Sequence, residues 1–158
     1  MAIATSSFAQ KGQKIGHINS NDLLTAMPER AEIQKQLDDL TTQLKVTLEA
    51  MGKERETKVA EFQAQQNNMT DLVKENKIKE ITDLEKRIAD FQENAQTELE
   101  KKNQELMAPI IDKAKEAIDA VAKENNYTYI IDTVSGVVLF SIDGDNILPL
   151  VKKKLGIQ

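Results

Sequence analysis

The feature that most constrains this 158-residue chain is the long separation between its strand patterns. Residues 14–18, "KIGHI", have the loose alternation of a short strand, and a helix pattern with Ser20 as its expected N-cap follows directly. A lone strand leaves its backbone N–H and C=O groups without partners. The next strand patterns, "YTYIID" (127–132) and "GVVLFSI" (136–142), come more than a hundred residues later. We therefore expect these distant segments to pair into one small sheet.

The segment between the strands, from Pro28 to about Asn125, has the pattern of helix almost throughout. Two seams of apolar residues, spaced as in a coiled coil, predict two helices that pack along one another. The first seam comprises Ile33, Leu37, Leu40, Leu44, Thr47 and Met51, and it continues after an eleven-residue step with Arg55, Val59 and Phe62. The second seam comprises Ile78, Ile81, Leu84, Ile88, Phe91, Ala95, Leu99 and Leu106. Polar residues at 63–71 separate the seams and predict a bend, so the whole reads as a helical hairpin. Pro109 is expected to interrupt the returning helix.

These patterns predict a mostly α-helical fold with a small β body, in the order strand, short helix, long helical hairpin, helix, two strands, short helix. Each limb of the hairpin would be ~60 Å long at ~1.5 Å per residue, which no compact domain of this size accommodates. We therefore expect residues 28–107 to form a coiled-coil arm that projects from a body made of residues 14–27 and 108–158. Residues 1–13 are expected to be a disordered tail or the remnant of a secretory signal peptide, because Ser7 and Ala9 are small as at a cleavage site.

The late strands are apolar on both faces, which predicts an oligomer. A sheet of three short strands from one chain does not readily cover both of its own faces, so other subunits are expected to bury them. The residues that we assign to this oligomerisation surface are Ile15, Ile18, Ile130, Val138 and Phe140.

Composition offers little for catalysis or for binding nucleic acid. His17 is the only histidine and there is no cysteine, so neither a histidine pair for a metal nor a thiol nucleophile can be assembled. We read His17 as an ordinary strand side chain and expect no enzyme activity, metal or cofactor. The net charge of −5 argues against a basic nucleic-acid surface. No segment approaches the ~18 apolar residues of a membrane span, so any membrane contact is expected to be peripheral.

A set of apolar residues near the bend is the candidate binding site. Each of them could pack inside the hairpin or contact an apolar partner, and the sequence leaves both readings open, with hairpin packing favoured for Phe62 and Ile78. The set comprises Val59, Phe62, Met69, Leu72, Val73 and Ile78.

The order of elements and two end segments resemble the Skp/OmpH family of periplasmic chaperones. The segment "KIGHINSNDLLTAMPE" (14–29) looks like the family's opening strand and helix, and "LMAPIIDKAKEAIDAVAKENNYTYIIDTVSGVVLFS" (106–141) is similar to its returning helix and closing strands. The resemblance covers about residues 14–155, although the arm matches only as generic coiled coil. It implies a homotrimer, exported to the periplasm by a signal peptide that is incomplete here. Such a trimer would hold unfolded outer-membrane proteins between its arms without ATP.

Two features depart from the family pattern. Well-known members are strongly basic with positive arm tips, whereas residues 51–90 carry eight Lys or Arg against nine Asp or Glu. We therefore carry over no lipopolysaccharide site. His17 stands where an apolar or aromatic residue is commoner.

The alternatives to a periplasmic chaperone are a structural coiled coil or tether, and a prefoldin-like holdase, although prefoldin hairpins lie between the helices rather than outside them. An enzyme is a more remote alternative.

Overall fold

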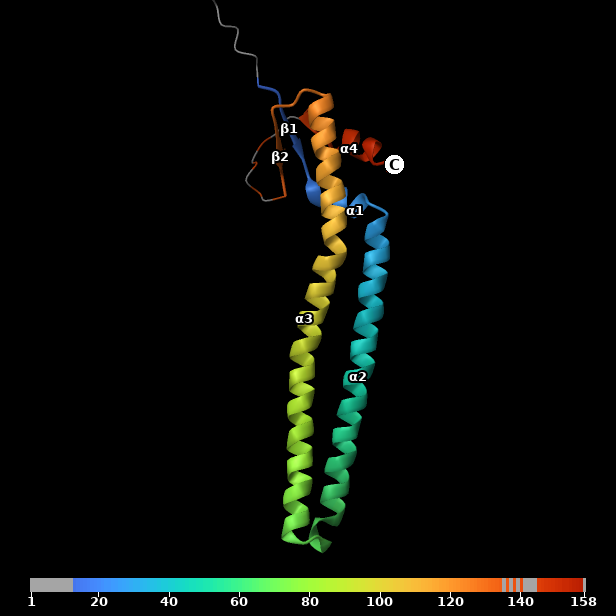
Figure 1. The fold of residues 1–158 in the computed structure, drawn as a ribbon, viewed down its shortest axis with the longest axis vertical. Coiled ribbons are helices and arrows are strands. Elements are labelled where there is room, and N and C mark those ends of the chain that lie inside the picture. Colours follow the sequence, from blue (N-terminus) through green and yellow to red (C-terminus); the bar gives the residue numbers. More distant parts are fainter. Residues whose placement is uncertain (1–12, 135, 137, 139, 141–144, 158) are drawn as a thin grey trace, which may run out of the picture. The chain divides into compact units, whose positions relative to one another are not determined.

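The computed structural model describes residues 13–134, 136, 138, 140 and 145–157. The elements are β1 (Ile15–Ile18), α1 (Ser20–Ala26), α2 (Glu29–Gln65), the short 3-10 helix η1 (Gln66–Asn68), α3 (Asp71–Glu124), β2 (Tyr129–Asp132) and α4 (Leu148–Lys154) (Figure 1). The predicted fold class, mostly helical with a small sheet, is confirmed. The predicted signal remnant or tail at 1–13 lies outside the described residues except for residue 13.

The chain divides into two compact units. The body unit comprises Met1–Arg30 and Pro109–Gln158, and the hairpin unit comprises Ala31–Ala108. In the body unit, β1 and β2 pair in parallel, from Ile15 opposite Tyr129 to Ile18 opposite Asp132. The predicted pairing of strands more than a hundred residues apart is therefore confirmed. Parallel strands need a long crossover connection, and the hairpin supplies it.

The third predicted strand, at 136–142, is not present in the described part of the chain. Gly136, Val138 and Phe140 lie outside any strand, and the other four residues lie outside the described residues. The sheet therefore has two strands where the structure describes it. Apolar, β-branched sequence favours a strand but does not supply the neighbouring strand that the backbone needs.

The junction between β1 and α1 differs by one residue from the prediction. Asn19, rather than Ser20, caps the helix, because its side-chain oxygen accepts hydrogen bonds from the backbone N–H groups of Asn21 (3.0 Å) and Asp22 (3.1 Å). Ser20 instead connects the start of α1 to the end of β2: its hydroxyl donates to Asp132 Oδ2 (2.5 Å) and its N–H donates to Asp132 Oδ1 (3.2 Å). Both residue types are good caps, so the sequence alone does not choose between neighbours.

The core of the body unit is small and aliphatic. Its largest fully buried side chains are Ile18, Leu23, Met27, Ile147 and Val151. Helices α1 and α4 contact one another around these residues. A second buried stripe runs along the body part of α3 at the helical spacing of four and three. It comprises Ile110, Ala114, Ala117 and Val121.

Gly16 in β1 is required by close packing. A Cβ atom there would lie 2.9 Å from Ile130 Cδ1 and 2.9 Å from the Tyr127 ring, which is closer than side-chain carbons approach. The Tyr127 ring is itself held below the Lys14 ammonium, 4.1 Å from its centroid, and Lys14 Nζ donates to the Asn125 carbonyl at 2.9 Å. These contacts fix the start of β1 against the end of α3.

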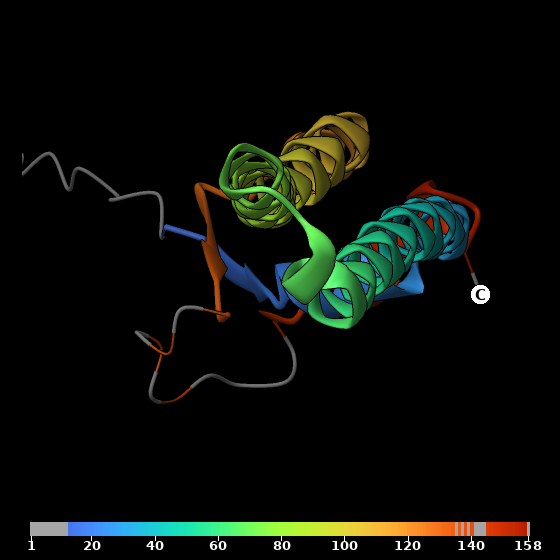
Figure 2. The same cartoon turned by 90° about the horizontal axis from the view of Figure 1, so that it is seen from below.

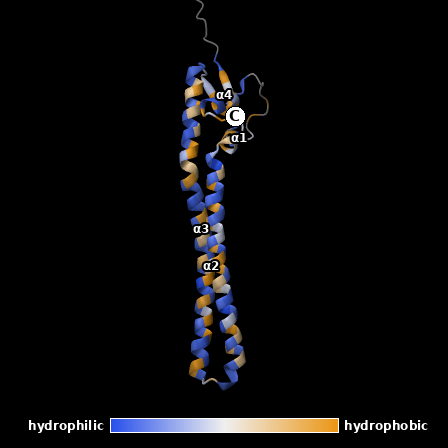
Figure 3. Cartoon of the chain, turned by 90° about the vertical axis from the view of Figure 1, so that its right-hand side faces the viewer, coloured by the Kyte–Doolittle hydropathy of each residue, from blue (hydrophilic) through white to orange (hydrophobic). Residues whose placement is uncertain are grey.

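In the hairpin unit, α2 and the first part of α3 run side by side and are joined through η1 (Figure 2). The predicted bend at 63–71 is therefore confirmed. Hydrophobic residues occur at intervals along both helices, with hydrophilic residues between them (Figure 3). Only Ile33 and Leu84 are buried among the described residues of this unit, at 5% and 2% exposure. Most of the other seam residues are half-buried, as expected for two helices that share one narrow stripe.

Three details of the predicted seam and helix are wrong. Thr47 is exposed and donates its hydroxyl to the Gln43 carbonyl (3.0 Å), while Leu48 is half-buried in its place. Ile78 is exposed as well. Helix α3 continues through Pro109 without interruption. Proline removes one helical hydrogen bond, and at this exposed position water can satisfy the carbonyl that loses its donor.

Candidate functional site

The six apolar residues predicted near the bend separate into two groups. Leu72, Val73 and Ile78 are exposed, and Leu72 has 69% of its surface accessible. Val59, Phe62 and Met69 are half-buried. For Phe62 this placement agrees with packing inside the hairpin, whereas Ile78 points away from the seam. The side chains most available to a partner near the bend are therefore those of the first two turns of α3.

The exposure of these residues follows from the seam that α3 uses. Its half-buried positions near the bend are Lys74, Lys77 and Ile81, which leads to the buried Leu84. The two lysines occupy the seam with their aliphatic stems and keep their charged ends in water. Positions 72, 73 and 78 therefore lie off the seam. The sequence shows the apolar residues but not that lysines take their place.

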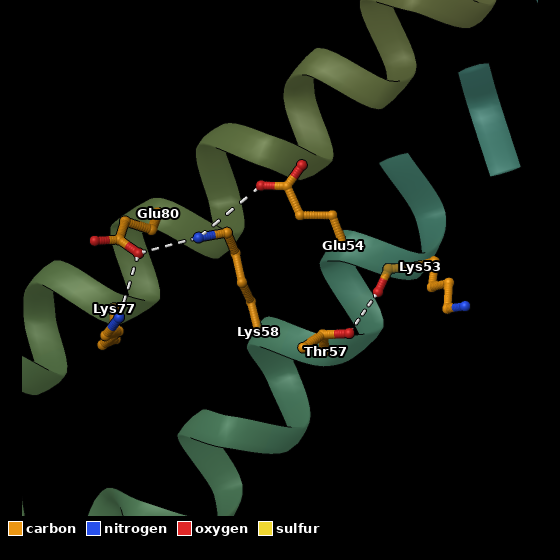
Figure 4. Close-up of polar contacts among 6 residues, drawn as sticks. All are labelled: Lys53, Glu54, Thr57, Lys58, Lys77 and Glu80. Carbon is orange, nitrogen blue, oxygen red and sulfur yellow. Dashed lines mark hydrogen bonds and ion pairs between the residues drawn. The ribbon is translucent and has the colours of Figure 1, made fainter. Parts of the chain in front are cut away.

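A network of ion pairs connects the two helices near the bend (Figure 4). Lys58 on α2 lies 3.4 Å from Glu80 on α3 and 4.0 Å from Glu54, and Lys77 also reaches Glu80 at 3.6 Å. The charge of Lys77, followed by the hydrogen bond from Lys58, lowers the pKa of Glu80 below its usual value. Because these groups are exposed or only half-buried, each pair contributes little to stability.

A second ion pair lies farther from the bend, where Arg55 approaches Glu85 at 3.5 Å. Basic and acidic groups are interspersed here, and eight Lys or Arg stand against nine Asp or Glu in residues 51–90. The hairpin near its bend is therefore close to neutral. An apolar partner would meet it without strong long-range attraction.

The sheet of the body unit carries the second candidate surface. Paired residues of parallel strands point to the same face, so Ile15, Tyr129 and Ile131 share one face, and all three are exposed. Of the residues assigned to oligomerisation, Ile18 is only 1% exposed and belongs to the core of its own chain, while Phe140 is 84% exposed. Ile130 and Val138 are half-buried.

Tyr129 and Ile131 were not among the residues assigned to oligomerisation. The alternation along β2 shows which of its residues share a face, but the register with β1 decides which of the two sets lies on the same face of the sheet as Ile15. That information is not local to either strand.

Chemical groups for catalysis are not assembled in the described part of the chain. His17 is half-buried in β1, and its carbonyl accepts a hydrogen bond from the Ile147 N–H at 2.9 Å. No cluster of three metal-ligating side chains occurs among the described residues. The search of those same residues finds no helix with the length and apolar character of a membrane span.

Comparison with known proteins agrees with this architecture. The chain is 26% identical over 160 residues to the chaperone protein Skp of Photorhabdus luminescens, with 98% of this chain and 93% of that protein covered. It is 28% identical, at the same coverage, to the chaperone protein Skp of Photorhabdus laumondii.

The fold matches a solved structure at low sequence identity. A crystal structure from Caulobacter crescentus, assigned as an OmpH-like outer membrane chaperone, superposes with a TM-score of 0.79 at 12% identity. The match covers 90% of this chain and 83% of that one. The sequence model of the outer membrane protein (OmpH-like) family matches residues 14–155, which is nearly the whole chain. The chain therefore belongs to the OmpH-like family.

Proposed function

We propose that this protein is an ATP-independent periplasmic holdase that binds unfolded outer-membrane proteins, its clients, between the helical hairpins of a homotrimer. The observation that carries the proposal is that three apolar side chains in the first two turns of α3, Leu72, Val73 and Ile78, are exposed on a helical hairpin of near-neutral charge. The relatives named chaperone protein Skp support the same conclusion. Unfolded polypeptides that expose apolar side chains are the class of partner that such a surface fits.

The chemistry of the client explains why this surface would suffice. A strand of an outer-membrane β-barrel alternates apolar and polar residues, and before insertion its unpaired edges promote aggregation. Scattered apolar contacts from several hairpins can cover such a chain without reading its sequence. Each contact is weak, so the client can leave as the contacts exchange and no nucleotide cycle is needed.

The homotrimer is proposed from the sheet of the body unit. Its exposed apolar face, with Ile15, Tyr129 and Ile131, is the kind of surface that subunits bury in an oligomer. Three hairpins held by one assembled body would present their apolar groups to a single client. Proteins of the outer membrane are met after export, so we propose the periplasm as the place of action.

Suppression of aggregation tests the proposal. A β-barrel outer-membrane protein is diluted from urea with and without equimolar trimer, and light scattering is followed at low and at high salt without ATP. We expect suppression at both salt concentrations, because the hairpin near the bend carries almost no net charge. A failure to suppress aggregation under either condition would contradict the chaperone function. Suppression that disappears at high salt would contradict only the apolar mechanism.

A matched pair of variants locates the contact. Leu72→Ser with Val73→Ser removes two exposed apolar side chains near the bend, whereas Val46→Ser removes one on α2 that is 60% exposed and lies away from it. We expect the double variant to need more protein for the same suppression and the Val46 variant to behave as the wild type. Equal activity of both variants would contradict the assignment of the binding surface.

A further inference from the structure

The body unit contains an apolar hollow that its own side chains leave open. It has a volume of about 380 Å³ and lies between the strands, α1 and α3. Its apolar lining comprises Ile18, Leu24, Ile111, Ala114, Ile118 and Ile130. Except for Ile18 and Ala114, these residues are only half-buried in the single chain. An open apolar hollow of this kind is a site for a partner's side chain.

Among the described residues, the same chain carries a large apolar side chain that is mostly exposed. Phe140 is 84% exposed, more than any other large apolar residue of the described part. It lies beside His17 and Val138, next to the sheet face of Ile15 and Ile131. Ile18 and Ile130, by contrast, belong to the opposite parity and face the hollow. The hollow and Phe140 are therefore two different surfaces of one subunit.

The charges around the two surfaces are complementary. Lys115 lines the hollow, and Asp22 lies with Phe140 along the second surface. Among the described residues, neither Lys115 nor Asp22 has an ion-pair partner. The other charged group of the hollow, Asp132, is already occupied by hydrogen bonds from Ser20. The hollow thus carries one cation, Lys115, and the surface around Phe140 carries one anion, Asp22, that have no ion-pair partner among the described residues.

We propose that Phe140 of one subunit inserts into the hollow of the next subunit, with Asp22 placed near the Lys115 of that neighbour. A phenylalanine side chain buries roughly 150–250 Å² of surface, and a hollow of this volume admits its ring. Because the two surfaces differ, the contact is head-to-tail rather than face to face, and in the proposed trimer three such contacts close a ring. The inference rests on the proposed homotrimer and adds the residues that would hold it closed.

Cysteine crosslinking between two chains tests this contact. The natural chain has no cysteine, so introduced thiols are the only ones present. Chains with Phe140→Cys are refolded together with chains carrying Ile118→Cys, and the mixture is oxidised. We expect a covalent dimer that contains one chain of each kind. The control replaces Ile118→Cys by Ala120→Cys, which lies on α3 but outside the lining of the hollow, and should give no crosslink.

The outcomes separate this inference from the proposed function. If the wild type is a trimer by light scattering but the mixture gives no crosslink, the inserted Phe140 is wrong and the trimer stands. Crosslinking between two Phe140→Cys chains would show a face-to-face contact and also overturn it. A wild type that stays monomeric would overturn both proposals.

A truncation of the aromatic ring gives a second, independent measurement. Phe140→Ala should leave the fold of the subunit intact, since the side chain is exposed there, but raise the concentration at which the trimer dissociates by about tenfold or more. Leu150→Ala, at an exposed residue of α4, is the control and should leave that concentration unchanged. An unchanged dissociation of the Phe140 variant would contradict the insertion.

Discussion

Replacing Leu84 by alanine should destabilise the hairpin unit far more than the body unit. Leu84 is 2% exposed and is, with Ile33, one of the two buried side chains in the described hairpin unit. Leucine-to-alanine changes in closed cores cost about 2.7–5.0 kcal/mol. The neighbours of Leu84 along α3, Ile81 and Ile88, are half-buried, so the cavity would open to water. The cost of the substitution should therefore be about 2.5 kcal/mol. That corresponds to a roughly 70-fold increase in the local opening equilibrium.

Amide hydrogen exchange, read by mass spectrometry, measures this opening segment by segment. The matched control is Leu72→Ala on the same helix, where the side chain is 69% exposed and the expected change is within about 0.5 kcal/mol. Faster exchange at residues 75–95 of the Leu84 variant, with unchanged exchange in α1 and α4, is the predicted result. Equal effects of the two substitutions, or equal acceleration in α1, would refute the reasoning. Leu84 would then not be the packed centre of a hairpin that opens by itself.

The remaining predictions concern the body unit and its independence. Partial burial raises the pKa of Asp132, but the hydrogen bonds from the Ser20 hydroxyl and from the backbone N–H groups of Val134, Ser20 and Thr133 outweigh it, so the net shift is downward from 3.8. The stability that this carboxylate contributes is therefore present above about pH 3.8 and lost below it. Asp132→Asn should lower the free energy of unfolding by about 1 kcal/mol at neutral pH, and below pH 3.8 the variant and the wild type should become equally stable. Urea unfolding at several pH values measures this difference. A constant difference at all pH values would contradict this linkage. Gly16→Val should lower the melting temperature strongly, since even a Cβ would lie 2.9 Å from Tyr127, and a thermal scan that finds no change would contradict the packing of β1. Deleting residues 55–66 together with 76–87 should leave the trimer intact by light scattering, and loss of the oligomer would show that the hairpin is part of the assembly.

The pairing of strands that are far apart in the sequence could be predicted because backbone N–H and C=O groups need hydrogen-bond partners. A strand at residues 15–18 must pair, and only the segment beyond residue 126 offered strand pattern, so the partner was determined by elimination. The bend followed from Asn67 and Asn68 between two apolar seams, and the structure places a short 3-10 helix there.

The details that could not be predicted are those in which two adjacent residues are equally suited to one structural position. Asn19 and Ser20 are equally good caps, and only the position of Asp132 in the fold gives Ser20 its other partner. Leu48 replaces Thr47 in the seam because a helix of 3.6 residues per turn drifts away from a strict seven-residue repeat, so the half-buried positions run 37, 40, 44, 48 and 51. Near the bend, lysine stems at 74 and 77 take the seam and leave Ile78 outside, which a count of apolar residues does not reveal.

Binding of a client to the assembled protein is the measurement that tests the central claim most directly. The chain has no tryptophan, so the tryptophan fluorescence of an unfolded outer-membrane β-barrel protein reports on the client alone. The client is held at fixed concentration in dilute buffer without ATP, and this protein is added stepwise. We predict a blue-shifted emission that saturates at three chains per client, with the client remaining in solution after centrifugation. Emission that stays unchanged while the client sediments would contradict the account.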